Sequence, residues 1–525
     1  MDFLIPKNAP GRRHNKHWQF CVGSGHAPLA LRADYMKMLR FIHDELGICY
    51  VRFHGIFNDD MEPLNSLESL FPLKGAERFR ELNFRKIACV YDNILDCGMK
   101  PFVELSFMPK LLASGDKQCF FYYKGNITPP ADYGEWSRFI ETFMRFLIGR
   151  YGETEVRSWY FEVWNEPDLW GFFSGTKEEY FKLYQATAEA IKAVDVRLRV
   201  GGPSTSASKW IHGFLSYCRE NSVPVDFVST HQYAGDPVGM IDVNGLLEQN
   251  ERPHAFQGFG SADLLKDLPD GDMLDALRYL LPDKSETTDI PDNVFRDNAA
   301  IVKKQARGLP VFYTEWNVNS TFSAYTNDTR KPAAYIVRAA LDTEGNIDRS
   351  SIWCFSDLFE EFHNFPQEFH GGFGLLTNNG IPKPSFYALK LLDRLTGLRL
   401  DLGGGATAGE IGIAAFRDEK TLQILLFRQK MKNVRLEPHE AVITVETDER
   451  PLSAAYMRID ETHCNPLRVW EEMGRPDNLT RAEVKRLTEQ TGLTEEPLDY
   501  AFSDGYARFS VKLGVNDVYL ITVNY

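Results

Sequence analysis

The sequence predicts an α/β fold, a (β/α)8 TIM barrel with an attached antiparallel β-sandwich, and two observations support it. Short apolar segments alternate with amphipathic stretches of helical period as far as about residue 397. Beyond that point, closely spaced segments of strand character dominate. Eight strand–helix units in sequence favour a closed parallel barrel over an open doubly wound sheet.

The predicted barrel strands are apolar runs bounded by Gly, Pro or polar residues. They are residues 19–23, 50–56, 101–107, 159–165, 198–202, 225–232, 310–316 and 351–358. The predicted barrel helices are residues 31–46, 78–98, 134–151, 177–194, 207–221, 293–307, 332–342 and 383–396. Gly23-Ser-Gly25, after the first strand, is too short for a dinucleotide-binding loop, so we expect no nucleotide cofactor.

The domain prediction places the catalytic barrel at 15–397 and an accessory β-sandwich at 398–525, with residues 1–14 as candidates to join the sandwich. The sandwich strands are expected at 409–416, 421–427, 441–446, 454–459, 507–513 and 517–524, with a helix at 478–491. Residues 234–292 are too long for an ordinary barrel loop, and we interpret them as an insertion that serves as a lid or an interaction segment.

Composition narrows the function. The formal net charge is −14, which disfavours binding to nucleic acids or anionic membranes. No run approaches the roughly 20 apolar residues of a membrane helix, and the N-terminus lacks a signal peptide pattern. The eight cysteines form no CxxC pair, so we expect free thiols and a cytoplasmic protein. The twelve histidines include no HxH or HExxH motif at a strand end, so we expect no metal.

Two glutamates carry the functional prediction. Glu166 ends the fourth predicted strand in Trp164-Asn-Glu-Pro167, and Glu315 ends the seventh. All strand ends of a parallel barrel open on one face, so the two carboxylates are expected to meet there. The apolar Trp164 and Trp170 would raise the pKa of Glu166, which suits a general acid. Two facing carboxylates indicate cleavage of a glycosidic bond, with inversion or retention left open.

Other polar residues cluster at the same strand ends. Arg52 and His54 alternate on strand two and therefore share a face. A buried Arg52 next to Glu315 would lower the pKa of Glu315. The alternative for Arg52 is an ion pair with only a structural role, and the alternative for His54 is a histidine of the core. His231 and Tyr233 share a face of strand six. Glu360 and Glu361 follow strand eight and are expected to accept hydrogen bonds from sugar hydroxyls, unless they are solvated loop charges.

These residues together resemble glycoside hydrolase family 39. The motifs are Arg52-Phe-His54-Gly with Asp59-Asp60-Met61, Trp164-Asn-Glu-Pro167, His231-x-Tyr233, Thr314-Glu-Trp-Asn317 and Phe369-His-Gly-Gly-Phe-Gly-Leu375. The resemblance covers most of the chain and implies a retaining mechanism with Glu166 as acid/base and Glu315 as nucleophile. It also implies that Asn165 holds the substrate 2-hydroxyl, that His231 and Tyr233 support the nucleophile and the sugar, and that Phe172 and Trp316 contact the substrate.

The leading expectation is a β-xylosidase acting on xylo-oligosaccharides. The segment Val318–Phe322 lacks the Ser-Tyr typical of many β-xylosidases, so β-galactosidase, β-glucosidase and α-L-arabinosidase activities stay open. α-L-Iduronidase activity is disfavoured because a uronate needs cationic recognition. A non-catalytic carbohydrate-binding protein and a metal-dependent hydrolase are further alternatives. Because related bacterial enzymes often assemble, we expect a homo-oligomer.

Overall fold

The computed structural model describes residues 2–234, 271, 273–280, 283, 290–362, 364–403, 407–408 and 410–525. Its centre is a closed barrel of eight parallel strands, which confirms the predicted fold class. The barrel strands are β3 (Cys21–His26), β4 (Tyr50–His54), β7 (Lys100–Glu104), β8 (Tyr160–Glu162), β9 (Arg199–Thr205), β10 (Phe227–Tyr233), β11 (Val311–Asn317) and β12 (Arg349–Ile352). Pairing of β12 with β3 closes the ring.

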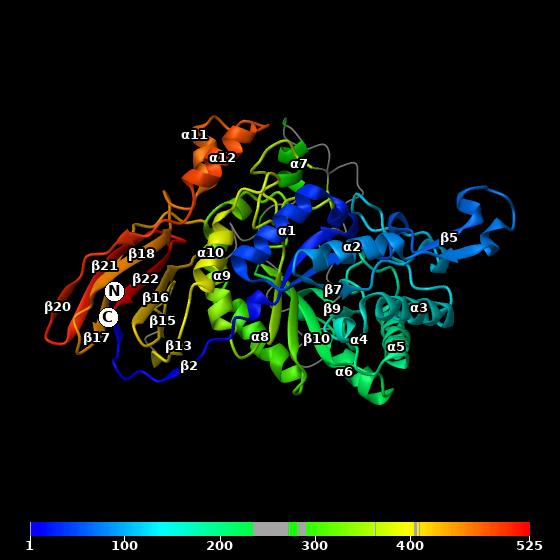
Figure 1. Cartoon of the computed structure of the whole chain (residues 1–525), viewed down its shortest axis with the longest axis horizontal. Coiled ribbons are helices and arrows are strands. Elements are labelled where there is room, and N and C mark those ends of the chain that lie inside the picture. Colours follow the sequence, from blue (N-terminus) through cyan, green and yellow to red (C-terminus); the bar gives the residue numbers. More distant parts are fainter. Residues whose placement is uncertain are drawn as a thin grey trace.

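Helices surround the barrel (Figure 1). They are α1 (Ala33–Leu46), α2 (Arg85–Asp96), α3 (Tyr133–Tyr151), α4 (Glu153–Val156), α5 (Lys177–Val194), α6 (Ile211–Glu220), α8 (Val294–Gln305), α9 (Lys331–Asp342) and α10 (Pro384–Asp393). The helix predicted at 78–98 begins only at Arg85, because the preceding residues form β6 (Arg80–Leu82), which pairs with β5 (Leu64–Ser66). This hairpin projects away from the barrel (Figure 1).

Aromatic side chains fill the barrel at the N-terminal ends of its strands. Phe20, Phe102, Tyr160, Phe227 and Phe312 are all buried and pack ring against ring. Gly201 makes room for them, because a Cβ there would lie 2.4 Å from the Phe227 ring. A filled lower half leaves the C-terminal strand ends as the place for chemistry.

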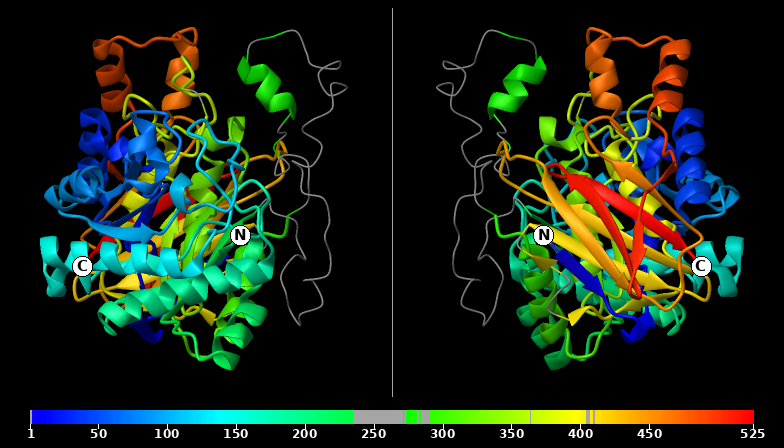
Figure 2. Two further views of the ribbon diagram at one scale, coloured as in Figure 1. Left: turned by 90° about the vertical axis from the view of Figure 1, so that its right-hand side faces the viewer. Right: turned by 90° about the vertical axis from the view of Figure 1, so that its left-hand side faces the viewer.

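The second unit consists of two sheets packed face to face (Figure 2). Its strands are mostly antiparallel: β13 (Leu398–Leu400), β14 (Thr407–Ala408), β15 (Ile411–Arg417), β16 (Thr421–Arg428), β17 (His439–Glu446), β18 (Ser453–Ile459), β19 (Glu496–Pro497), β20 (Ala501–Ser503), β21 (Tyr506–Leu513) and β22 (Val518–Asn524). Side chains such as Ile443 and Phe509 of one sheet meet Ile424 and Ile521 of the other in a single core. This is a sandwich built on the alternation of inward and outward residues.

The N-terminus contributes to both sheets of the sandwich. β1 (Asp2–Ile5) pairs in parallel with β17, and β2 (Gly11–Arg13) pairs antiparallel with β13. Two short helices, α11 (Pro466–Glu472) and α12 (Arg481–Gln490), interrupt the strands, and Thr480 and Glu483 form the reciprocal hydrogen bonds of a capping box at the start of α12.

Most of the predicted insertion at 234–292 lies outside the described residues, and its role as a lid or interaction segment stays a prediction. Within it the structure describes α7 (Met273–Leu280), whose Leu274 packs in one apolar cluster with Tyr233 and Trp353. All eight cysteines are described and none is in a disulfide. Across the described residues, every helix is too short or too polar to span a bilayer.

Candidate active site

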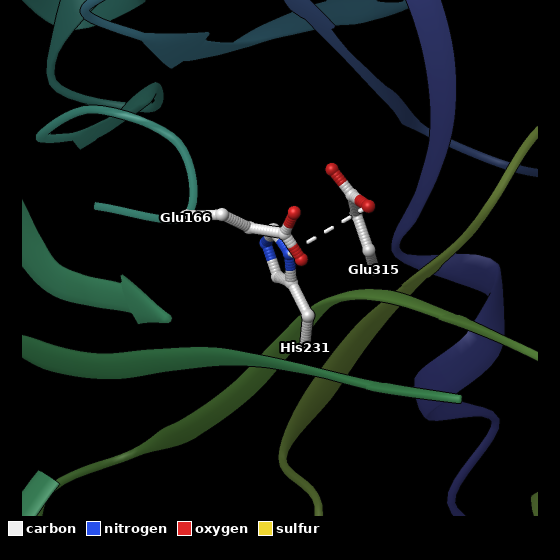
Figure 3. Close-up of side chains that lie close together, drawn as sticks. All are labelled: Glu166, His231 and Glu315. Atoms are coloured by element: carbon white, nitrogen blue, oxygen red, sulfur yellow. Dashed lines mark hydrogen bonds and ion pairs between the residues drawn. The ribbon is translucent and has the colours of Figure 1, made fainter. Parts of the chain in front are cut away.

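Glu166 and Glu315 meet at the C-terminal face of the barrel. Glu166 lies just after β8 and Glu315 lies in β11, and both side chains are buried. One carboxylate oxygen of each and a ring nitrogen of His231 all lie within 4.8 Å of one another (Figure 3). Three side chains from distant parts of the sequence are therefore brought to one point, as the barrel topology predicts.

Arg52, which is fully buried on β4, binds three carboxylates. Its Nε donates to Glu162 Oε2 at 2.6 Å, and its Nη1 donates to Glu315 Oε1 at 2.8 Å. Nη2 lies 2.9 Å from Glu104 Oε2 and donates to Asn165 Oδ1 at 2.8 Å. The planar fork of the guanidinium thus holds the orientation of Glu315 and of the amide that precedes Glu166.

Glu104 and Glu162 were not among the predicted site residues. Each lies within an apolar strand run, where a charge is costly unless it is paired. Burial opposes ionisation of Glu104, but His54 and Arg52 outweigh it and lower its pKa. Glu162 also accepts a hydrogen bond from Thr314 Oγ1 at 2.8 Å, so both of its oxygens have a donor.

His231 links the two central carboxylates. Its Nδ1 lies 3.0 Å from Glu166 Oε1 and 3.6 Å from Glu315 Oε2. Its Nε2 faces the Arg52 guanidinium at 3.5 Å, and a guanidinium has only hydrogens to offer, so Nε2 is the acceptor and Nδ1 carries the proton. Burial, with a further contribution from Arg52, lowers the pKa of His231. The imidazole is therefore neutral and donates toward the carboxylates.

Both oxygens of Glu315 are held by donors. Arg52 binds Oε1, and the Tyr233 hydroxyl donates to Oε2 at 2.8 Å. Tyr233 and His231 alternate on β10, which explains why both reach the same carboxylate. A carboxylate with two fixed oxygens keeps one orientation, which suits attack on a defined atom.

His54 and Glu361 form a second charged pair beside this centre. His54 Nδ1 lies 2.7 Å from Glu104 Oε2, and its Nε2 lies 3.3 Å from Glu361 Oε1. Burial alone would lower the pKa of His54, but Glu104 and Glu361 outweigh it and raise that pKa to about 10. Burial raises the pKa of Glu361 to about 7, with Glu315 and Glu166 adding to the effect.

Aromatic rings surround the charged pair. The rings of Phe172 and Phe121 lie 6.4 Å and 6.3 Å from the His54 ring, and that of Trp353 lies 4.9 Å from it. Phe172 was predicted at the site, whereas Trp353 and Phe121 were not. Trp353 directly follows β12, so its place at a strand end was the signal available in the sequence.

Two predicted site residues are not brought into this cluster. Trp316 follows Glu315 in β11 and therefore points to the other face of the strand, where its ring packs 5.5 Å from Phe295 of α8. Glu360 has a φ of 57°, which sends it away from its neighbour Glu361, and it pairs with Arg32 at 3.2 Å.

The grouping of Glu166, His231 and Glu315 has the donor types of a metal site. However, the Arg52 guanidinium already places a positive charge 2.8 Å from Glu315, and the protonated Nδ1 of His231 faces Glu166. The same positions would have to be vacated for a cation to bind. The arrangement is therefore better suited to acid–base and nucleophilic chemistry.

Comparison with known families decides the classification. The model of the glycosyl hydrolases family 39 matches residues 1–253 and 283–501. The chain belongs to this family. It is therefore a glycoside hydrolase, as the two facing carboxylates predict.

Curated relatives of this glycoside hydrolase include two enzymes named β-xylosidase. The one from Caldicellulosiruptor saccharolyticus is 37% identical over 97% of this chain and 95% of its own length. The one from Geobacillus stearothermophilus is 34% identical over 99% of this chain and 94% of its own length. A solved structure described as a monomeric β-xylosidase from Caulobacter crescentus superimposes with a TM-score of 0.77, at 27% identity, over 100% of this chain and 99% of that one.

Proposed function

We propose that this glycoside hydrolase is a retaining exo-β-xylosidase that releases xylose from xylo-oligosaccharides. The observation that carries the mechanism is the separation of the two carboxylates. One oxygen of Glu166 and one of Glu315 lie within 4.8 Å of each other, which is consistent with the roughly 5–5.5 Å between the carboxyl groups of retaining enzymes. The choice of xylose is supported by the two β-xylosidases that match nearly the full length of the chain.

In the first step Glu315 attacks the anomeric carbon and Glu166 donates a proton to the glycosidic oxygen. The carbon–oxygen bond to the leaving sugar breaks as the bond to Glu315 forms, so the leaving sugar departs as a neutral alcohol. Arg52 and Tyr233 hold Glu315 for this attack at 2.8 Å each. Asn165, which accepts from Arg52 through Oδ1, keeps its amide hydrogens for the sugar 2-hydroxyl.

In the second step water attacks the same carbon and Glu166 takes its proton. The bond to Glu315 breaks and its carboxylate is restored. Two inversions give net retention at the anomeric carbon. The Nδ1 hydrogen of His231 stabilises Glu166 when that carboxyl has lost its proton, at the stage where a base is needed.

The test is hydrolysis of aryl β-xyloside, β-galactoside, β-glucoside and α-L-arabinoside, with Glu315→Ala beside the wild type. We expect the β-xyloside to be cleaved fastest, and Glu315→Ala to lose nearly all turnover. Azide should rescue Glu315→Ala and give the product of opposite anomeric configuration. Glu178→Ala, an exposed glutamate at the start of α5, is the matched control. Near wild-type activity of Glu315→Ala would refute the mechanism; a faster second sugar would refute only the choice of xylose.

We also propose that the enzyme assembles into a homo-oligomer. Support comes from the arm that contains β5 and β6, which exposes six large apolar side chains: Leu67, Leu70, Phe71, Leu73, Phe79 and Leu82. Such a group is unusual on a monomer. Light scattering on the wild type and on Leu70→Ser/Leu73→Ser tests this, since a monomeric wild type would refute it.

We also propose a cytoplasmic location, which the eight unpaired cysteines support.

A further inference from the structure

A row of aromatic side chains runs outward from the candidate active site. It begins at Phe172, whose ring lies 6.4 Å from that of His54. Phe120 lies 5.8 Å from Phe172, and Trp170 lies 6.4 Å from Phe120. Exposure increases along the row, because Phe172 is 7% exposed, Phe120 is half-buried and Trp170 is 41% exposed. The row therefore joins the buried centre to the solvent.

The outer end of this row belongs to the same tight turn as Glu166. The amide of Leu169 donates to the Glu166 carbonyl at 2.9 Å, and the amides of Phe172 and Phe173 donate to the Leu169 carbonyl at 3.0 Å. Asp168 anchors the turn, because it accepts from the Ser206 amide at 2.8 Å. Trp170 is thus held at a fixed place relative to Glu166.

Phe120 is seated against this turn. A Cβ added at Gly171 would lie 2.7 Å from the Phe120 ring, so the ring rests directly on the backbone there. Phe120 also packs against Phe121 with ring centroids 4.4 Å apart. Gly171, in the same turn as Trp170, and Phe120, in the segment after β7, therefore form a rigid support beside Trp170.

A large aromatic side chain left exposed on a rigid turn suits a ligand with an apolar face, and the faces of pyranose rings are apolar. The glycosidic oxygen that Glu166 protonates belongs to the leaving sugar. That sugar must therefore lie on the side of the cleavage point that Glu166 occupies. Trp170 is the exposed aromatic residue in the turn that Glu166 begins.

We propose that Trp170, supported by Phe120, is the binding surface for the leaving xylosyl residue. This inference rests on the proposed function and assigns its second sugar site. A stacked sugar is positioned with its glycosidic oxygen beside Glu166. The same surface receives the incoming group in the second step. When a sugar hydroxyl replaces water there, its oxygen attacks the anomeric carbon, Glu166 takes its proton and Glu315 leaves.

The test compares xylobiose, which has a leaving sugar, with β-xylosyl fluoride, whose leaving group has no ring to stack. Trp170→Ala should lower kcat/KM for xylobiose by roughly fivefold to tenfold, mainly through KM, as expected for one lost aromatic contact. Its turnover of β-xylosyl fluoride should stay at the wild-type level. Trp170→Phe should recover most of the loss with xylobiose. Phe41→Ala, a partly exposed aromatic residue on α1, is the matched control.

Equal losses with both substrates would assign Trp170 a structural role and overturn the inference, as would an unchanged kcat/KM for xylobiose. Transfer to added xylose instead of water gives an independent readout. Trp170→Ala should lower this transfer fraction, and an unchanged fraction would contradict the shared surface. If wild-type enzyme cleaves neither substrate, the proposed function fails and the inference falls with it. If the wild type cleaves both substrates, the proposed function is upheld regardless of the result with Trp170→Ala.

Discussion

Replacing Arg52 by Met should strongly destabilise the barrel at neutral pH. Arg52 is fully buried and contacts Glu162, Glu315 and Glu104 at 2.6, 2.8 and 2.9 Å. Removing one partner of a buried ion pair costs about 3–5 kcal/mol, because the other charge stays buried. Here the carboxylates keep other donors, including Thr314 for Glu162 and Tyr233 for Glu315. We therefore expect a loss of about 4 kcal/mol in the free energy of unfolding.

The loss of stability caused by Arg52→Met should be smaller at acidic pH. In the wild type the pKa of Glu104 is lowered, so its contribution to stability is present above the ordinary value of 4.5 and lost as the pH falls through the folded pKa. Without Arg52, burial should raise the pKa of Glu104 above that value. A carboxyl with a raised pKa costs stability as the pH rises through 4.5, so the variant improves as the pH falls. Both trends reduce the difference in the free energy of unfolding between the wild type and Arg52→Met as the pH falls.

Unfolding in urea at about pH 7 and about pH 5 measures this difference, with circular dichroism and intrinsic fluorescence as probes. Arg52→Met/Glu162→Gln is the informative companion, since it removes the charge of one carboxylate that has lost its cation and should recover part of the loss. A destabilisation below about 1 kcal/mol, or the same value at both pH values, would refute the reasoning. So would a double variant no more stable than Arg52→Met.

Three further changes have defined outcomes. Tyr233→Phe removes a hydrogen bond to Glu315 and should lower kcat/KM on an aryl xyloside roughly tenfold to hundredfold with little change in the thermal midpoint; an unchanged rate would contradict this role. Lys383→Met leaves Asp328 and Asp357 buried without their shared cation and should lower the free energy of unfolding by about 3–5 kcal/mol. Thermal unfolding measures this loss, and an unchanged thermal midpoint would contradict the prediction. Ionisation of Glu361 costs stability as the pH rises from 4.5 to about 7, so Glu361→Gln should remove up to about 3 kcal/mol of the pH dependence of the free energy of unfolding. Urea unfolding across this pH range measures it, and an unaltered slope would argue against the prediction.

The barrel was predictable because its signals are local. Each strand is an apolar run ended by turn residues, and each helix shows its own period, so no long-range information was needed. The helix predicted at 78–98 began too early, since Arg80–Leu82 pairs with Leu64–Ser66 and tertiary pairing overrides helical propensity. The pairing of Asp2–Ile5 with β17 has no local signal at all.

The polar centre was partly accessible from the sequence. Glu315 was selected because a charge in an apolar strand needs a partner, and the same rule applied to Glu104 and Glu162 would have found them. Strand alternation also places Trp316 opposite Glu315, so its position was readable from the sequence. The divergence of Glu360 from Glu361 depends on a loop dihedral angle, which residue types do not determine.

The pairing of β1 with β17 has a consequence for biosynthesis. Phe3 and Ile5 leave the ribosome before the residues that cover them at 439–446, which follow more than four hundred positions later. At roughly 5–20 residues per second, this segment waits on the order of 20 to 90 s without its partner. During that time it is an unpaired edge strand with apolar side chains, and such strands invite association between chains. Slow translation between the two strands would lengthen this interval, so yield in a cell depends on how fast the ribosome reaches residue 446.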